Sequence, residues 1–193
     1  MNYQELYKIL TSCYAVAPKK DIRYYLNSVH IKANEGGYTI EVTDGHKLVQ
    51  FKSDNLIQGI VTEIDVILDI TYVKLFIDKI KAMQYHKTDL HDVVITSVES
   101  GCINFNIGGI AIIDGRYPDC ERVIWKDFPK PVGEIGFDAR LLADILKVTK
   151  PFNSNPCQPV KMEFKDTMAS ARIKFDTNIE SLSAVMILVP CRI

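Results

Sequence analysis

The sequence predicts an α+β protein in which a helix followed by about three strands occurs three times. Amphipathic helices are predicted to begin near residues 3, 72 and 138, at nearly equal intervals in a chain of 193 residues. Between them, short runs alternate apolar and polar side chains, as expected for antiparallel sheets with one exposed face. A short strand and an N-capping Asp or Thr precede the second and third helices. The unit is therefore βαβββ-like, with the helices on one face of the sheets.

The first repeat begins with a helix over residues 3–16, whose inner face carries Leu6, Ile9 and Leu10. Strands are then predicted over 28–32, 38–43 and 47–51. A Gly-rich hairpin turn at residues 34–37 joins the first two of these strands, and Asp44-Gly45 forms a second tight turn. The result is a meander with a polar corner between residues 43 and 47.

The second and third repeats follow the same order. The second is predicted to contain a strand over 64–70, a helix capped by Thr71, and strands over 92–97, 102–107 and 110–113. The third is predicted to contain a strand over 134–137, a helix capped by Asp138, and strands over 160–164, 169–175 and 184–189. On the third helix, we expect Leu141, Leu142, Ile145 and Leu146 to face inward, and Arg140, Asp144, Lys147 and Lys150 to face solvent.

Composition argues against several classes of protein. The formal charge is −1, so contact with nucleic acid would depend on local basic patches. No apolar run reaches membrane-spanning length, and no signal-peptide pattern precedes Tyr3. The five cysteines form no C-x-x-C pair and no zinc-site spacing, which is typical of reduced thiols. We expect a cytoplasmic protein with no metal, no cofactor and no membrane partner.

Three motifs carry a resemblance to a known family. They are Asp21–Asn27 (DIRYYLN) followed by Thr43–Leu48 (TDGHKL), Asp114–Asp119 (DGRYPD) followed by Arg122-Val123, and the chain end Ile187–Ile193 (ILVPCRI). Together they resemble the bacterial replicative sliding clamp, the DNA polymerase III β subunit. The resemblance implies the DNA-clamp fold. It matches residues 1–117 to the clamp's complete second domain, 118–132 to a linker, and 133–193 to the second half of its third domain.

The resemblance also implies a pocket for the short clamp-binding peptides of DNA polymerases, the clamp loader and repair proteins. Its residues here would be Leu26, Thr43, Gly45, His46, Lys47, Leu48, Pro118, Arg122, Val123, Ile187, Leu188, Val189, Pro190, Cys191, Arg192 and Ile193. Such a pocket needs apolar walls for an anchoring side chain and a few polar groups to orient the peptide. Val189, Cys191 and Ile193 replace the family's usual Met, Met and Leu, which implies a stiffer rim and a shifted peptide preference.

A clamp holds duplex DNA through phosphate charge and without sequence preference, so that it can slide. The candidate DNA-contacting residues are Lys8, Lys19, Lys20, Arg23, Tyr24, Tyr25, Lys74, Lys81, Arg140, Lys147 and Lys150. Each of the three helices carries at least one of these cations. Taken alone, basic residues on an outer helix face are usually solvated surface.

Assembly follows from counting repeats. The resemblance implies clamp rings of twelve βαβββ units, and three units per chain then give four chains. We expect a homotetrameric ring in which the third repeat of one chain pairs head-to-tail with the first repeat of the next. A truncated clamp of this kind would suit a virus, such as a phage, or a mobile element.

Two other functions compete with the ring-shaped clamp. One is a clamp-like decoy that forms no ring and binds a host clamp or clamp-binding peptides, since a decoy would keep the same pocket. The other is an enzyme using Asp44 and His46 near Asp21. No nucleophile motif, close carboxylate pair or phosphate-binding Gly loop accompanies these residues, so the sequence favours a protein that is not an enzyme.

Overall fold

The computed structural model describes residues 1–193 except 60–62, 86–91, 100, 154, 156 and 192–193. Within these residues the helices are α1 (Tyr3–Val16), α2 (Ile70–Tyr85) and α3 (Ala139–Thr149), with 3-10 turns at Tyr24–Leu26 and Cys120–Arg122. The strands are β1 (Ser28–Asn34), β2 (Gly37–Thr43), β3 (Lys47–Ser53), β4 (Ile64–Asp69), β5 (Ile95–Glu99), β6 (Cys102–Phe105), β7 (Gly108–Ala111), β8 (Val160–Glu163), β9 (Ala171–Phe175) and β10 (Leu182–Leu188). The predicted α+β class is confirmed.

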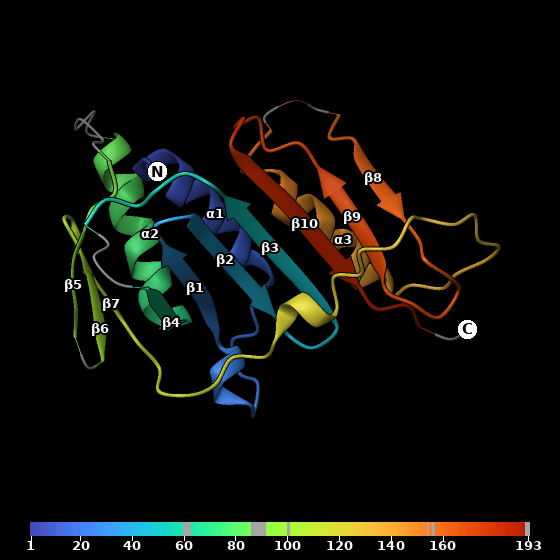
Figure 1. The fold of residues 1–193 in the computed structure, drawn as a ribbon, viewed down its shortest axis with the longest axis horizontal. Helices are drawn as coiled ribbons and strands as arrows, with labels where there is room; N and C mark the ends of the chain where they lie inside the picture. The colour runs from blue at the N-terminus through green and yellow to red at the C-terminus, as the bar shows by residue number, and fades with distance from the viewer. Residues whose placement is uncertain (60–62, 86–91, 100, 154, 156, 192–193) are drawn as a thin grey trace.

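The strands form two antiparallel sheets (Figure 1). One has seven strands in the order β4-β1-β2-β3-β10-β9-β8, and the other has three in the order β5-β6-β7. The seven-stranded sheet joins the first and third repeats, because β3 pairs with β10 from Lys47↔Leu188 to Ser53↔Leu182. Helices α1 and α3 cover one face of this sheet, and α2 packs beside α1.

The pairing of β3 with β10 bears on the expected contact between chains. It fills the β3 edge of the first repeat with the third repeat of the same chain. The third repeat therefore belongs to the same core as the first, and Ser12 of α1 donates a 2.7 Å hydrogen bond to the carbonyl of Val148 in α3. Because β1 also pairs with β4, the described first repeat has no free sheet edge for the third repeat of another chain, and the number of chains stays a prediction.

The two predicted turns are formed by glycines with positive φ. Gly37 has φ 130° at the start of β2, where an added Cβ would lie 2.1 Å from the carbonyl oxygen of Ser53. Gly45 has φ 89° in the turn between β2 and β3. Since other residues rarely adopt these angles, both turns depend on glycine.

The third helix is rotated relative to its predicted orientation. Leu142 and Leu146 are 38% and 58% exposed, whereas Asp144 is only 8% exposed. The physical reason is that Lys47 lies within 3.1 Å of Asp144 and gives this carboxylate a partner inside the protein. The prediction that both leucines face inward and that Asp144 faces solvent was wrong.

Two predictions at helix starts were also wrong. Asp69, not Thr71, caps α2, because its carboxylate accepts a 2.7 Å hydrogen bond from the Thr71 amide. Residues 134–137 do not form a strand, and only Gly136 makes an isolated bridge, to Cys191. Asp138 caps α3 as predicted, accepting from the Arg140 amide at 2.8 Å.

The segment predicted as a linker is fixed along the sheet. Arg172 of β9 donates to the carbonyl of Trp125 at 2.7 Å, and its guanidinium stacks 3.9 Å from the Trp125 ring. Arg172 also pairs with Glu163 of β8 at 2.7 Å. Burial would raise the pKa of Glu163, but hydrogen bonds from Arg172, Lys174 and Lys161 hold it at about 2.

This carboxylate makes folding stability sensitive to acid. Because the folded pKa of Glu163 is depressed, its stabilising contribution is present above its ordinary pKa and is lost as the pH falls from about 4.5 towards 2. We expect Glu163→Gln to flatten the fall in unfolding free energy across this interval, measured by urea denaturation at several pH values. Glu180→Gln, at an exposed position, is the control. Equal flattening in both variants would contradict the assignment.

Candidate functional site: a cavity where the first and third repeats meet

A cavity of about 270 Å³ lies beside the end of the β3–β10 ladder. Four segments that are distant in sequence supply most of its lining: the 3-10 turn at Tyr24–Leu26 with the preceding Arg23, the turn between β2 and β3, the end of β10, and the segment after Tyr117. Its lining residues are Arg23, Tyr25, Leu26, Thr43, Gly45, His46, Lys47, Leu48, Pro118, Asp119, Cys120, Val123, Ser170, Ile187 and Val189. The apolar walls come from both the first and third repeats, so the cavity exists only where they join.

The polar corner on one side of the cavity is held by Asp44. Its carboxylate accepts hydrogen bonds from the amides of His46 and Lys47 at 2.8 and 2.9 Å, and from Lys47 Nζ at 2.5 Å. Burial would raise the pKa of Asp44, but these bonds hold it below its ordinary value. Thr43 Oγ1 donates to the Lys47 carbonyl at 2.7 Å and accepts from the Gly45 amide at 3.1 Å. The turn is therefore rigid before any ligand binds.

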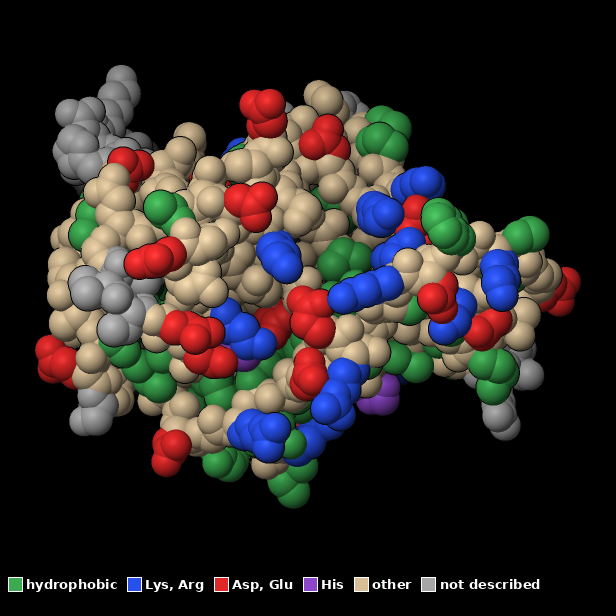
Figure 2. All heavy atoms as spheres, in the orientation of Figure 1, with side chains coloured by type: hydrophobic (Ala, Val, Ile, Leu, Met, Phe, Trp, Pro, Cys, Tyr) green, Lys and Arg blue, Asp and Glu red, His purple; other side chains and the backbone are tan. Residues whose placement is uncertain are grey.

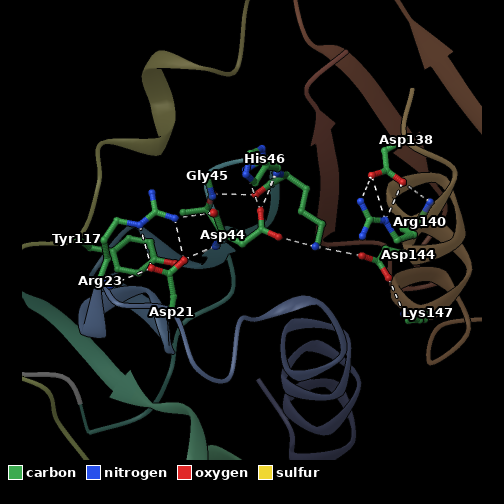
Figure 3. Close-up of polar contacts among 12 residues, drawn as sticks. Asp21, Arg23, Asp44, Gly45, His46, Tyr117, Asp138, Arg140, Asp144 and Lys147 are labelled. Atoms are coloured by element: carbon green, nitrogen blue, oxygen red, sulfur yellow. Dashed lines mark hydrogen bonds and ion pairs between the residues drawn. The ribbon is translucent and has the colours of Figure 1, made fainter. Parts of the chain in front are cut away.

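Lys47 connects this turn to the third repeat (Figure 3). Its ammonium lies between two carboxylates, that of Asp44 in the turn and that of Asp144 on α3. Asp144 also pairs with Lys147 at 2.6 Å. The Lys47 side chain is 10% exposed. Burial would lower the pKa of Lys47, but the two carboxylates raise it above its ordinary value. The ammonium thus remains charged and joins the two halves of the cavity wall.

Arg23 lies on the other side of the same turn (Figure 3). Its guanidinium pairs with Asp21 at 2.8 Å and donates to the Asp44 carbonyl at 3.0 Å. Hydrogen bonds from Arg23 lower the pKa of Asp21 to about 2. A Cβ on Gly45 would lie 3.1 Å from Arg23 Nη1, so glycine also allows this close contact.

Tyr117 places the linker against the sheet. Its hydroxyl accepts a 2.9 Å hydrogen bond from the Thr43 amide, and its ring lies 4.6 Å from the ring of His30. Burial raises the pKa of Tyr117 well above its ordinary value. His30 is itself held by Glu41 at 3.0 Å and Asp65 at 2.6 Å. The linker residues that follow Tyr117 therefore have a fixed position over the cavity.

The structure places ten of the sixteen predicted pocket residues around this cavity. Leu188 is instead fully buried in the core, and Arg122 is exposed and pairs with Asp119. Pro190 and Cys191 lie beyond the lining residues, and Arg192 and Ile193 lie outside the described residues. Sequence reasoning missed the lining residues Asp119, Cys120 and Ser170. For Asp119 and Cys120, the only signal in the sequence was their position between the predicted pocket residues Pro118 and Val123.

The predicted DNA-contacting residues divide into two groups. Arg23 and Tyr25 line the cavity, and Tyr24 packs edge-on against Tyr25 beside it. The remaining eight, Lys8, Lys19, Lys20, Lys74, Lys81, Arg140, Lys147 and Lys150, lie on the helices or directly after α1 and α3.

Several of these helix cations already contact a carboxylate or a ring. Lys74 pairs with Asp78 and Arg140 with Asp138, and Lys19 lies 3.5 Å from the centre of the Tyr14 ring. Burial lowers the pKa of Lys19 to about 8. On the sheet side of the molecule, Lys and Arg are interspersed with Asp and Glu (Figure 2). The paired helix cations therefore do not indicate a dense basic patch on the helices.

A larger hollow of about 840 Å³ opens near the gap between the two sheets. Charged residues of both signs contribute to its walls, among them Lys32, Asp65, Asp114 and Arg116. The smaller cavity is the better candidate for an apolar peptide, because the side chains of Leu26, Leu48 and Ile187 form one hydrophobic cluster beneath it.

The two carboxylates considered for an enzyme, Asp21 and Asp44, already have hydrogen-bond partners. Asp44 is bonded to Lys47 and to two amides, and Asp21 is bonded to Arg23. In the described part of the chain, no group of three or more His, Cys, Asp or Glu residues is placed to hold a metal ion. None of the helices, over the residues described, is long and apolar enough to cross a membrane.

Bacterial DNA polymerase sliding clamps are among the solved structures that share this arrangement. The DNA polymerase sliding clamp of Pseudomonas aeruginosa matches 100% of this chain with a TM-score of 0.78 and 18% sequence identity. The chain has the sliding-clamp fold. Caulobacter crescentus pol III beta gives a TM-score of 0.76 at 19% identity, as does the Bartonella birtlesii sliding clamp bound to griselimycin. Both matches cover 100% of this chain.

This chain spans just under two thirds of those clamps, covering 66% of the Pseudomonas protein and 65% of the other two. No protein-family model matches the sequence, and no curated protein does. The predicted resemblance to a shortened clamp is confirmed at the level of the fold.

The link between the first and third repeats can be tested by removing Lys47. We expect Lys47→Met to lower the free energy of unfolding by about 1–3 kcal/mol, because it leaves Asp44 and Asp144 without their shared cation. Urea denaturation measures this change. Lys147→Met is the matched control, since the Lys147 side chain is 57% exposed and such pairs contribute about 0–1 kcal/mol. Equal losses in both variants would show that Lys47 has no special structural role.

Proposed function

We propose that this protein is a DNA sliding clamp, a non-enzymatic processivity factor that surrounds duplex DNA and tethers a polymerase in the cytoplasm. The observation that carries the proposal is the cavity at the β3–β10 junction. Ten residues chosen from three separated sequence motifs line this one cavity. That convergence supports the peptide-binding role that the motifs imply, in a chain whose fold is that of sliding clamps.

The cavity suits an extended peptide with one apolar anchor. Leu26, Leu48 and Ile187 provide a buried apolar floor, and Val123 and Val189 are half exposed at its rim. Burying one Leu or Phe side chain there would contribute roughly 1.5–3 kcal/mol. Arg23 and His46 lie at the polar side, where their N–H groups can orient the peptide backbone or a carboxylate.

The rim valines give a direct test of the pocket. We expect Val123→Glu or Val189→Glu to weaken binding of a labelled polymerase C-terminal peptide by about tenfold or more, because each places a charge against the apolar anchor. Fluorescence anisotropy measures the affinity. Both valines are exposed enough, at 48% and 43%, for the fold to tolerate the change. Val98→Glu, at a 45% exposed position on β5, is the control. If neither rim variant changes the affinity for the peptide, the pocket proposal is contradicted.

The helix face is the proposed surface for DNA. Its cations are few, and Lys74, Arg140 and Lys147 share their charge with nearby carboxylates. A surface of this kind favours weak contacts with phosphates, which a sliding protein needs.

Removing four helix cations should weaken DNA retention. We expect replacement of Lys74, Lys81, Arg140 and Lys147 with Gln to lower affinity equally for unrelated duplex sequences. The dependence of log affinity on log salt should become shallower by about 0.9 for each lost phosphate contact. The charge-matched control replaces Lys52, Lys126, Lys130 and Lys165, which lie on β3, in the linker or after β8. If the control set lowers DNA affinity and the salt dependence as much as the helix set does, DNA does not bind specifically at the helix face.

A further inference from the structure

In the first two repeats, the segment that precedes each helix pairs with the other repeat. Asn2, directly before α1, forms an antiparallel bridge with Asp92 of the second repeat, and the Val93 amide donates to the Met1 carbonyl at 3.1 Å. In return, β4, directly before α2, pairs with β1 of the first repeat over its whole length. Helices α1 and α2 pack side by side above this exchange. A leading segment thus pairs with the neighbouring repeat.

The third repeat has a leading segment in the same position. Gly136, shortly before α3, bridges Cys191, shortly after β10, and the Cys191 amide donates to Gly136 at 2.9 Å. In the second repeat, Leu68 of β4 bridges Ile112, directly after β7. Residues 134–137 therefore lie against the end of their own repeat, as β4 does.

The other edge of this segment differs from that of β4. On this edge β4 pairs with β1, whereas residues 134–137 pair with no strand among the described residues. The amides of Ile135 and Phe137 donate no hydrogen bond to any described residue. The counterpart of β1 in the third repeat is β8, the last strand of the seven-stranded sheet, and it pairs only with β9. Among the described residues, this repeat thus has a leading segment and a first strand that are each paired on one edge only.

Helix α3 also has one open flank. Asp144 points from α3 toward Lys47 of the first repeat (Figure 3). Leu142 and Leu146 lie two positions before and after Asp144, which puts each about 200° around the helix from it. They are 38% and 58% exposed. The flank of α3 opposite the first repeat is therefore apolar and exposed, whereas α1 has a helix on both sides.

We propose that a second copy of this chain covers this face, with two third repeats packed across a two-fold axis. Residues 134–137 of each copy pair with β8 of the other, and Leu142 and Leu146 pack against the partner's helix. This contact repeats between chains the reciprocal exchange that the first two repeats make within one chain, and a reciprocal contact between identical surfaces is two-fold symmetric. It rests on the proposed ring and defines one of its contacts between chains.

A head-to-tail contact fits the same edges less well. The other end of the chain presents β7, the last strand of the second repeat. Two kinds of pairing join repeats in this protein. The last strand of one repeat pairs with the last strand of another, as β3 does with β10. The first strand of one repeat pairs with the segment that precedes the helix of another, as β1 does with β4. Since β8 is a first strand, its matching partner is a leading segment, which β7 does not provide.

Two double variants separate these arrangements. One is Leu142→Glu with Leu146→Glu on α3, and the other is Tyr72→Glu with Leu75→Glu on α2, at side chains 50% and 61% exposed. Sedimentation velocity at micromolar concentration gives their masses. We expect the α2 variant to retain a species of about twice 21.9 kDa, and the α3 variant to lose that species. Amides of Ile135, Phe137 and β8 should exchange slowly in the α2 variant and at least tenfold faster in the α3 variant.

Circular dichroism and peptide binding at the β3–β10 cavity verify that both variants are folded. An α3 variant with the mass of the parent overturns this contact and leaves the clamp proposal standing. A monomeric α2 variant, or a complex of the two variants when mixed, also overturns it, because a head-to-tail contact predicts both results. A parent protein that is monomeric at micromolar concentration overturns the contact and the ring together, and favours the decoy.

Discussion

The pairing of β3 with β10 is the contact on which the rest of this structure depends. It joins segments more than 100 residues apart in the chain, and it merges the first and third repeats into one sheet with a shared core. Lys47 reinforces the same junction, since its ammonium lies between a carboxylate of the turn and a carboxylate of α3. A buried cation with two such partners is costly to leave unpaired, so it fixes how the third repeat sits against the first.

The candidate binding cavity is a consequence of this junction. The Val189 amide donates to the His46 carbonyl at 3.0 Å at the end of the ladder, which brings the rim of one wall to the turn of the other. Tyr117 then holds the linker across the remaining side through the Thr43 amide. A peptide bound there would contact all three segments, and its affinity would report on the integrity of the junction.

The sequence was sufficient to predict the three repeats and the two glycine turns, because hydrophobic period and turn chemistry are local properties. Most of the cavity wall was predicted from the resemblance of three motifs to the sliding-clamp family, not from these local patterns. Sequence reasoning misplaced the face of α3, since the partner that allows Asp144 to be buried is Lys47, far away in the chain. It also predicted a strand at 134–137. Apolar and polar side chains alternate there, but among the described residues no strand pairs with this segment. Both errors concern contacts between distant segments, which no local pattern encodes.

Encirclement of DNA is the central claim of this account, and DNA topology tests it most directly. The protein is incubated with a nicked circular duplex at a concentration low enough for subunits to exchange, so that assemblies close around the DNA. Bound protein is then measured at moderate salt before and after one restriction cut linearises the circle. A clamp that surrounds DNA slides off the new ends, so occupancy should fall to near background. Occupancy that is the same on circular and linear DNA would contradict encirclement.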